Sequence, residues 1–100
     1  MVKHIVFWKL KDHANGMDKA ANALQIKSKL ERLNGQIEGL IRIEVGLDFL
    51  HSQESADVVL YSEFTDREAL DFYQQHPLHK EIMPFIAEAR SERRVVDYEV

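Results

Sequence analysis

The order in which hydrophobic periodicity changes along the chain is the strongest constraint on its fold. Strand-like segments, rich in β-branched and aromatic side chains or alternating apolar with polar residues, cover residues 2–11, 40–49, 57–64 and 93–100. Apolar residues recur at helical spacing from Asp18 to about Asn34 and Gly35, and again between residues 65 and 90. The order βαββαβ predicts an α+β, ferredoxin-like protomer with a four-stranded antiparallel sheet and helices on one face.

Local signals predict where the helices begin and end. Asp18 is placed to cap the first helix, and Gly35 supplies the left-handed residue that commonly follows a helix. Thr65 and Glu68 have the spacing of a capping box, which predicts that the second helical region begins at Thr65.

Two prolines divide the second helical region. His76 precedes Pro77, so one helix should end there and a new one should begin at the proline. Pro84 lies inside the second piece and lacks a backbone N–H, which predicts a bend or break before it.

Composition narrows the classes of function. The chain has 100 residues, of which 45% are hydrophobic, which suits one domain spanning residues 1–100. The net charge is −4 with no basic block, so neither nucleic acid nor a membrane surface is an expected partner. The chain has no cysteine, which excludes disulfides, thiolate catalysis and Cys-bound zinc. No segment resembles a signal peptide or membrane span, and we expect a cytoplasmic protein.

Two strands are apolar on both faces. Alternation places Val6, Trp8 and Leu10 on one face of the first strand, which the helices should cover. The opposite face is expected to carry the side chains of Ile5, Phe7, Val59 and Tyr61. An uncovered apolar face of this size favours a homodimer in which the sheets of two copies pack face to face.

Three ionisable rings gather at the junction between the two helical pieces: Tyr73, His76 and His79. If Pro77 opens a helix, His79 lies in its first turn, where the positive end of the helix dipole lowers the imidazole pKa. A neutral His79 can act as a general base, and Tyr73 can donate to an oxygen that gains negative charge. His4 shares the inner strand face with Val6 and Trp8, so we expect it across the same cavity.

The same residues also have structural interpretations. His4 can be a core histidine with satisfied nitrogens, His76 a helix cap, and Tyr73 part of an amphipathic core. His13 and His51 lie in polar connecting segments and are expected to be exposed.

A metal site is a further alternative, because three imidazoles, those of His4, His76 and His79, can bind zinc. The spacing of the last two is not the i, i+4 spacing of a helical metal site, and no carboxylate lies beside them at ligand spacing. We therefore expect no metal, and the sequence supports no haem, flavin or other cofactor.

Several segments together have a recognisable pattern: Lys3-His4-Ile5-Val6, Gly46 after Ile43-Glu44-Val45, Phe64 to Leu70, Tyr73 with His76-Pro77-Leu78-His79, and Val95-Val96-Asp97-Tyr98. This pattern resembles the stress-responsive dimeric α/β-barrel (Dabb) family from Val2 to Glu99. The resemblance implies a ferredoxin-like protomer whose sheet pairs with that of a second copy in a dimeric barrel.

The family includes plant heat- and salt-stress proteins, a plant polyketide cyclase and many bacterial members of unknown role. The cyclase performs a cofactor-free aldol condensation, and the resemblance assigns its tyrosine and histidine to Tyr73 and His79, with His4 near the pocket. Arg90 stands where an aromatic pocket residue would be expected, so a long acyl chain is not expected to fit.

Two functions remain open. One is a homodimer that binds a small hydrophobic or carbonyl ligand, or protects under stress, without chemistry. The alternative is a cofactor-free cyclase or lyase for a carbonyl substrate, with His79 as base and Tyr73 as oxyanion donor. The other residues expected to line the pocket are Val6, Trp8, Leu30, Leu60, His76 and Ile82. Trp8 is large enough either to border this pocket or to fill it.

Overall fold

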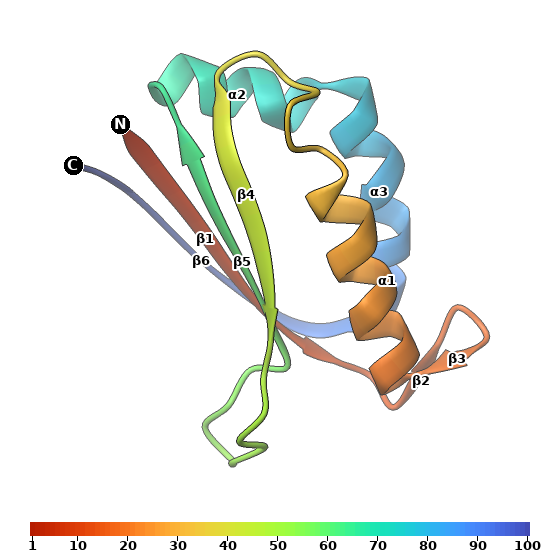
Figure 1. The fold of residues 1–100 in the computed structure, drawn as a ribbon. Helices are drawn as coiled ribbons and strands as arrows, with labels where there is room; N and C mark the ends of the chain where they lie inside the picture. The colour runs from red at the N-terminus through yellow and green to blue at the C-terminus, as the bar shows by residue number, and fades with distance from the viewer.

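The computed structural model describes all 100 residues, as a sheet with helices packed against it (Figure 1). The elements are β1 (Val2–Leu10), β2 (His13–Ala14), β3 (Met17–Asp18), α1 (Lys19–Glu31), β4 (Leu40–Leu47), β5 (Val58–Phe64), α2 (Arg67–Gln75), α3 (Pro77–Ala89) and β6 (Arg90–Glu99).

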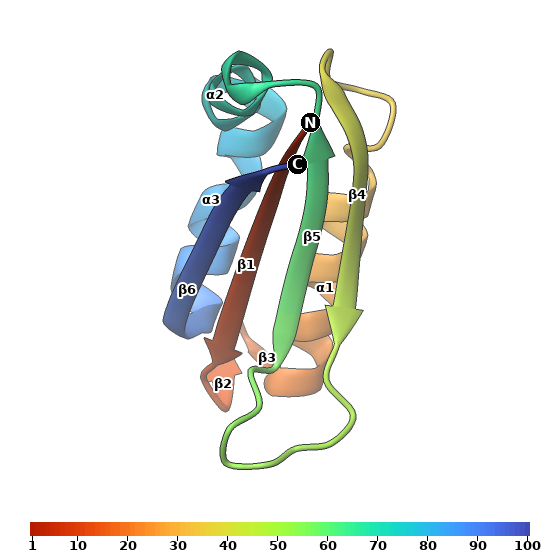
Figure 2. The same ribbon diagram turned by 90° about the vertical axis from the view of Figure 1, so that its left-hand side faces the viewer.

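The main sheet has the strand order β4-β5-β1-β6, and all neighbouring strands are antiparallel (Figure 2). This arrangement confirms the predicted ferredoxin-like fold. Strand β1 lies inside the sheet, where His4 is opposite Ser62 on β5 and Asp97 on β6. The first and last strands of the chain are therefore neighbours, which brings residues from both ends of the sequence to one place.

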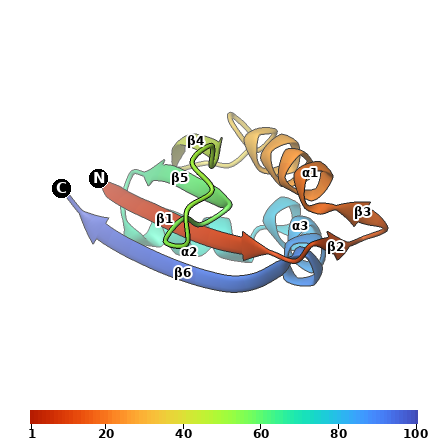
Figure 3. The same ribbon diagram turned by 90° about the horizontal axis from the view of Figure 1, so that it is seen from below.

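The three helices lie on one side of the main sheet (Figure 3). The inner face of β1 is buried beneath them: Val6 is 1% exposed and Trp8 is 4% exposed. On the outer face Phe7 is 40% and Val96 is 51% exposed, because no element of the chain covers them. The prediction of one covered and one uncovered apolar face is thus confirmed for the protomer.

Strand β4 departs from the predicted alternation at its start and its end. The pairing with β5 shifts register between Leu40 and Arg42, so Leu40 and Ile43 are both buried while Ile41 is exposed. A bulge of this kind inserts one residue and reverses the faces of the residues before it. The strand also ends before Phe49, which is 90% exposed.

The first predicted cap is confirmed and the second is wrong. The Asp18 carboxylate accepts from the N–H of Ala21 at 2.8 Å, as expected for an N-cap. The second helix is capped by Asp66, whose carboxylate accepts from the N–H of Ala69 at 2.8 Å. The N–H of Thr65 instead donates to the Gly39 carbonyl, which ties this residue to the start of β4.

Three other features differ from the predictions. Helix α1 ends at Glu31, before Gly35, and residues 32–36 form hydrogen-bonded turns after it. Helix α3 is not broken at Pro84 and continues to Ala89, although the proline supplies no backbone N–H to the helix. The short hairpin β2–β3 between β1 and α1 was not predicted; its Asn15 and Gly16 have φ of 53° and 73°, as in a tight type I′ turn.

Candidate active site

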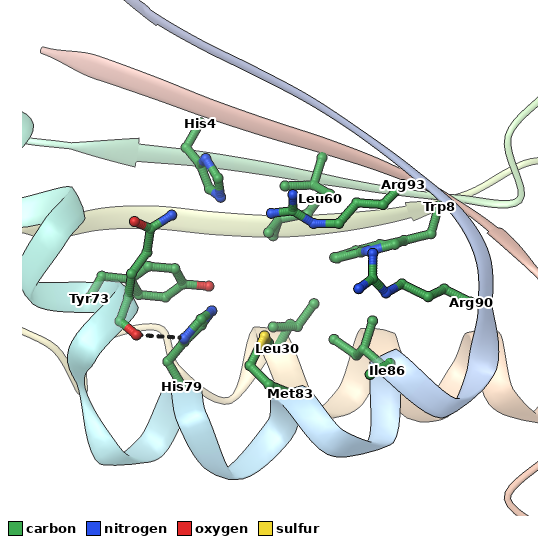
Figure 4. A pocket seen from close by; sticks show the side chains of 13 residues that line it. His4, Trp8, Leu30, Leu60, Tyr73, His79, Met83, Ile86, Arg90 and Arg93 are labelled. Atoms are coloured by element: carbon green, nitrogen blue, oxygen red, sulfur yellow. Dashed lines mark hydrogen bonds between the residues drawn. The ribbon is translucent and has the colours of Figure 1, made fainter.

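A cavity of about 140 Å³ lies between the inner face of the sheet and the helices (Figure 4). Its thirteen lining residues are His4, Val6, Trp8, Leu30, Leu60, Tyr73, Gln74, His79, Met83, Ile86, Ala87, Arg90 and Arg93. An engineered cavity of about 150 Å³ in another protein holds benzene, so this space suits a ring-sized group. Trp8 borders the cavity and does not fill it.

Tyr73 and His79 are in contact at one end of this cavity. Tyr73 comes from α2 and His79 from the first turn of α3, and their ring centroids are 4.4 Å apart. Both are brought there by the break between the helices at His76 and Pro77, which turns the chain while keeping the two side chains on the sheet side. The predicted convergence of a phenol and an imidazole is thus present.

The environment of His79 fixes which nitrogen is free. Its Nδ1–H donates to the carbonyl of Gln74 at 3.2 Å, so the neutral ring keeps its lone pair on Nε2 (Figure 4). Burial lowers the pKa of His79 below its ordinary value of 6.5; the hydrogen bond to Gln74 opposes this shift, and the nearby side chains of His4 and Arg93 add to it. His79 is therefore a neutral imidazole near pH 7 with Nε2 as the available base.

The Tyr73 hydroxyl is a buried donor with no partner. The side chain is fully buried, and its oxygen makes no hydrogen bond within the protein. Burial raises the pKa of Tyr73, so the phenol stays protonated. Buried polar groups normally have partners, so this unpaired donor on the cavity wall is available to an acceptor on a bound molecule.

His4 is held by a carboxylate from the last strand. Its Nδ1 is hydrogen-bonded to Asp97 Oδ1, its cross-strand neighbour, and its ring lies 6.4 Å from that of Tyr73. With Nδ1–H donating to the carboxylate, Nε2 is left on the cavity side, where Figure 4 shows the tip of the ring. Asp97 was not predicted as a site residue, although its place opposite His4 follows from pairing the first strand with the last.

Three polar groups lie at the other end of the cavity. Trp8 comes from β1, while Arg90 and Arg93 come from the start of β6 (Figure 4). The indole Nε1–H of Trp8 is the second buried polar group without a partner. Arg93, like its neighbour Arg94, is exposed, and it was not predicted as a site residue because nothing in the sequence distinguishes the two.

Two residues expected in the pocket lie outside it. His76 is half-buried at the N-terminus of α3, where its Nδ1 accepts from the N–H of Leu78 at 3.1 Å. Ile82 points between α3 and α1, because it is one helical turn past Leu78 and faces Leu33 rather than the sheet.

The histidines do not gather around a metal. No group of three or more His, Cys, Asp or Glu side chains is placed to hold a metal ion. His76 Nδ1 is used by the Leu78 N–H outside the cavity, and His4 Nδ1 is occupied by Asp97, so the alternative of a three-histidine site is wrong. His13 and His51 are exposed, as predicted.

The fold and this cavity define a small ferredoxin-like α+β protein with a site between the sheet and the helices. The model of the stress-responsive A/B barrel domain family, Dabb, matches residues 2–100, and the chain belongs to this family.

Several solved structures share this fold. A dimeric protein of unknown function with a ferredoxin-like fold, from Bacteroides fragilis, is 36% identical, with a TM-score of 0.86 over 99% of this chain and 95% of that one. A Dabb family protein from Mesorhizobium loti is 24% identical, with a TM-score of 0.72 over 99% and 95% of the two chains. A protein from Arabidopsis thaliana is 22% identical, with a TM-score of 0.81 over 100% and 95%.

A search of the curated proteins gives no match. None of the helices has the length and apolar character needed to cross a membrane.

Proposed function

We propose that the protein is a homodimer whose cavities catalyse cofactor-free proton transfer next to the carbonyl group of a small molecule. The observation that carries this proposal is the contact between Tyr73, a buried phenol without a partner, and His79, a neutral imidazole with a free Nε2. The two groups supply a hydrogen-bond donor and a base on one side of a ring-sized space.

The dimer is supported by the outer face of the sheet. Phe7, Val96 and Tyr98 are 40%, 51% and 41% exposed there, and Ile5 lies between them. A second copy presents the same face by two-fold symmetry, which buries both. The relative from Bacteroides fragilis is described as dimeric.

The chemistry is an enolisation. His79 Nε2 takes a proton from the carbon next to the carbonyl, and the electron pair of that C–H bond forms the C=C bond of an enolate. The Tyr73 O–H donates to the enolate oxygen, where the negative charge develops. The enolate carbon then regains a proton from the imidazolium. Alternatively, this carbon attacks a second carbonyl of the same molecule in an aldol closure, and the alkoxide formed from that carbonyl takes the proton from the imidazolium. A positioned base of this kind typically contributes roughly 10²- to 10⁴-fold.

His4 is assigned a role on the opposite side of the substrate. Asp97 holds its ring with Nε2 on the cavity side, so a bound carbonyl compound lies between two imidazoles. In this position His4 accepts or returns a proton on the face that His79 does not reach.

The exchange of α-protons in D₂O tests the proposal. Acetophenone is a suitable probe, because its ring matches the cavity and NMR follows the loss of its methyl protons. We expect the wild-type protein to accelerate exchange and His79→Asn to abolish the acceleration. Asparagine retains a donor for the Gln74 carbonyl and lacks the base. His51→Asn is the matched control, since the His51 side chain is 75% exposed, and it should exchange like wild type.

A binding measurement separates catalysis from binding alone. Trp8 is the only tryptophan and borders the cavity, so its fluorescence reports occupancy. Quenching by acetophenone without faster exchange would leave a binding protein and refute the proposed chemistry. Exchange that persists in His79→Asn would also refute it.

A further inference from the structure

We infer that the natural ligand is an oxo acid that places a free carboxylate on Arg90, Arg93 and Trp8, with its carbonyl at Tyr73 and His79. The carbonyl half of this inference rests on the proposed function. The carboxylate half rests on the other end of the cavity, which the proposed chemistry does not use.

The two arginines reach the cavity because α3 continues into β6 without a loop. Arg90 is the residue at which the helix ends and the strand begins, and Arg93 is paired with Trp8 across the sheet. Figure 4 shows both guanidinium groups turned toward the cavity, with that of Arg93 directed toward its middle. The positive charge of Arg93 helps to lower the pKa of His79, so its electrostatic effect reaches the opposite end of the cavity.

Neither guanidinium has a carboxylate partner. The ion pairs of the protein use other cations, and none of the thirteen lining residues is acidic. In a chain with a net charge of −4, two unpaired arginines beside one cavity leave a local positive charge that an anionic ligand can neutralise.

A structural role at the end of α3 does not explain Arg90. The last two carbonyls of the helix already have partners: Lys11 Nζ donates to the Glu88 carbonyl, and the Lys11 N–H donates to that of Ala89. The backbone N–H of Arg90 itself donates to Ile86. Its side chain is therefore not needed as a cap.

Trp8 adds an independent observation. The side chain is 4% exposed, and its Nε1–H has no partner in the protein. A carboxylate has two oxygens and can accept from a guanidinium and an indole N–H at once. An uncharged apolar ligand would leave this donor buried and unpaired, which costs free energy.

The middle of the cavity defines the spacer. Leu30, Leu60, Met83 and Ile86 lie between the two polar ends (Figure 4). A ligand that fits all three parts has a carbonyl at one end, a ring-sized apolar centre and a carboxylate at the other. A thioester of the same acid lacks the charge that the arginines would bind.

Two probes that differ in one group test this inference. In 4-acetylbenzoate a benzene ring separates an acetyl group from a carboxylate, and 4′-methylacetophenone replaces the carboxylate by a methyl group. Both are titrated against the quenching of Trp8 fluorescence. We expect 4-acetylbenzoate to bind about 10- to 100-fold more tightly, the range for hydrogen bonds to a charged group.

Arginine variants locate the effect. Arg90→Met and Arg93→Met keep much of each aliphatic stem and remove the charge, so each should reduce the preference for the carboxylate, and the pair should abolish it. Arg94→Met is the matched control, because Arg94 is adjacent in sequence and lies on the opposite face of β6. It should retain the full preference, and thermal melts establish that each variant is folded.

The outcomes separate the inference from the proposed function. Equal affinity for both probes overturns the inference, and so does a preference that is undiminished in the folded single arginine variants or that persists in the folded double variant. A carboxylate preference without α-proton exchange in either probe retains the inference and refutes the proposed chemistry. If both probes exchange their α-protons equally fast and bind with equal affinity, the proposed chemistry is retained and the inference is refuted.

Discussion

Removing the hydroxyl of Tyr73 should stabilise the free protein while it impairs the site. The side chain is fully buried, and its oxygen has no hydrogen-bond partner. The folded protein therefore offers this group no partner in place of the hydrogen bonds it makes to water in the unfolded chain, and an unpaired buried polar group costs about 1–3 kcal/mol. Tyr73→Phe removes that cost and keeps the ring against Phe64, whose centroid lies 5.0 Å away.

The expected gain is about 1 kcal/mol, taken at the low end because the hydroxyl borders a cavity. For a domain of this size, about 1 kcal/mol raises the Tm by roughly 4–8 °C. Urea unfolding followed by circular dichroism should show the same sign. Exchange of acetophenone protons should fall by about 10²- to 10³-fold, the typical loss when one oxyanion donor is removed.

Tyr61→Phe is the matched control for this prediction. The Tyr61 hydroxyl donates to Glu63 at 2.6 Å, so the same chemical change removes a real hydrogen bond and should lower stability by up to about 1 kcal/mol. Both variants are compared at one protein concentration, since stability of a dimer depends on it. A Tyr73→Phe protein that is destabilised like Tyr61→Phe would show that the hydroxyl has a partner, and the argument for an unoccupied donor would fail.

Three further predictions concern His79, the outer face and the second helix. The pKa of His79 is lower in the folded protein than in the unfolded chain, so the unfolded state binds more protons once the pH falls below 6.5. The free energy of unfolding should therefore decrease as the pH drops through that value. His79→Asn should remove this part of the pH dependence, which urea titrations at several pH values measure. Phe7→Glu should dissociate the proposed dimer or prevent folding, because the interface would bury an unpaired charge. The control Leu24→Glu, on the exposed side of α1, should behave like wild type in analytical sedimentation. A stable Phe7→Glu dimer would contradict the proposed interface. Asp66→Ala should lower stability by about 1 kcal/mol through loss of the helix cap, and Thr65→Ala should cost less; the reverse order in thermal unfolding would contradict the observed cap.

The sequence was sufficient for the fold because its periodicities are local and agree with one another. Alternation in β1 correctly assigned Val6 and Trp8 to the buried face and Phe7 to the uncovered one. The errors arose where one extra residue or a competing carboxylate decides the structure. The bulge at the start of β4 exposes Ile41, and Asp66 caps the helix that Thr65 was predicted to begin.

The site was only partly predictable for a different reason. Tyr73 and His79 are six residues apart, so the helix junction between them could be read from Pro77. Asp97 and Arg93 reach the site only through the pairing of β6 with β1, which joins opposite ends of the chain. Their roles depend on strand register, and residue type and spacing alone do not determine that register.

The protonation state of His79 tests the account most directly, because the proposed chemistry requires a neutral ring with a free Nε2. In protein labelled with ¹⁵N-histidine, the shifts of the two ring nitrogens distinguish both neutral tautomers from the imidazolium. At pH 7 we predict one protonated nitrogen, Nδ1, and an unprotonated Nε2 whose shift changes when 4-acetylbenzoate is added. A His79 ring that carries its proton on Nε2, or that is doubly protonated at pH 7, would contradict the account.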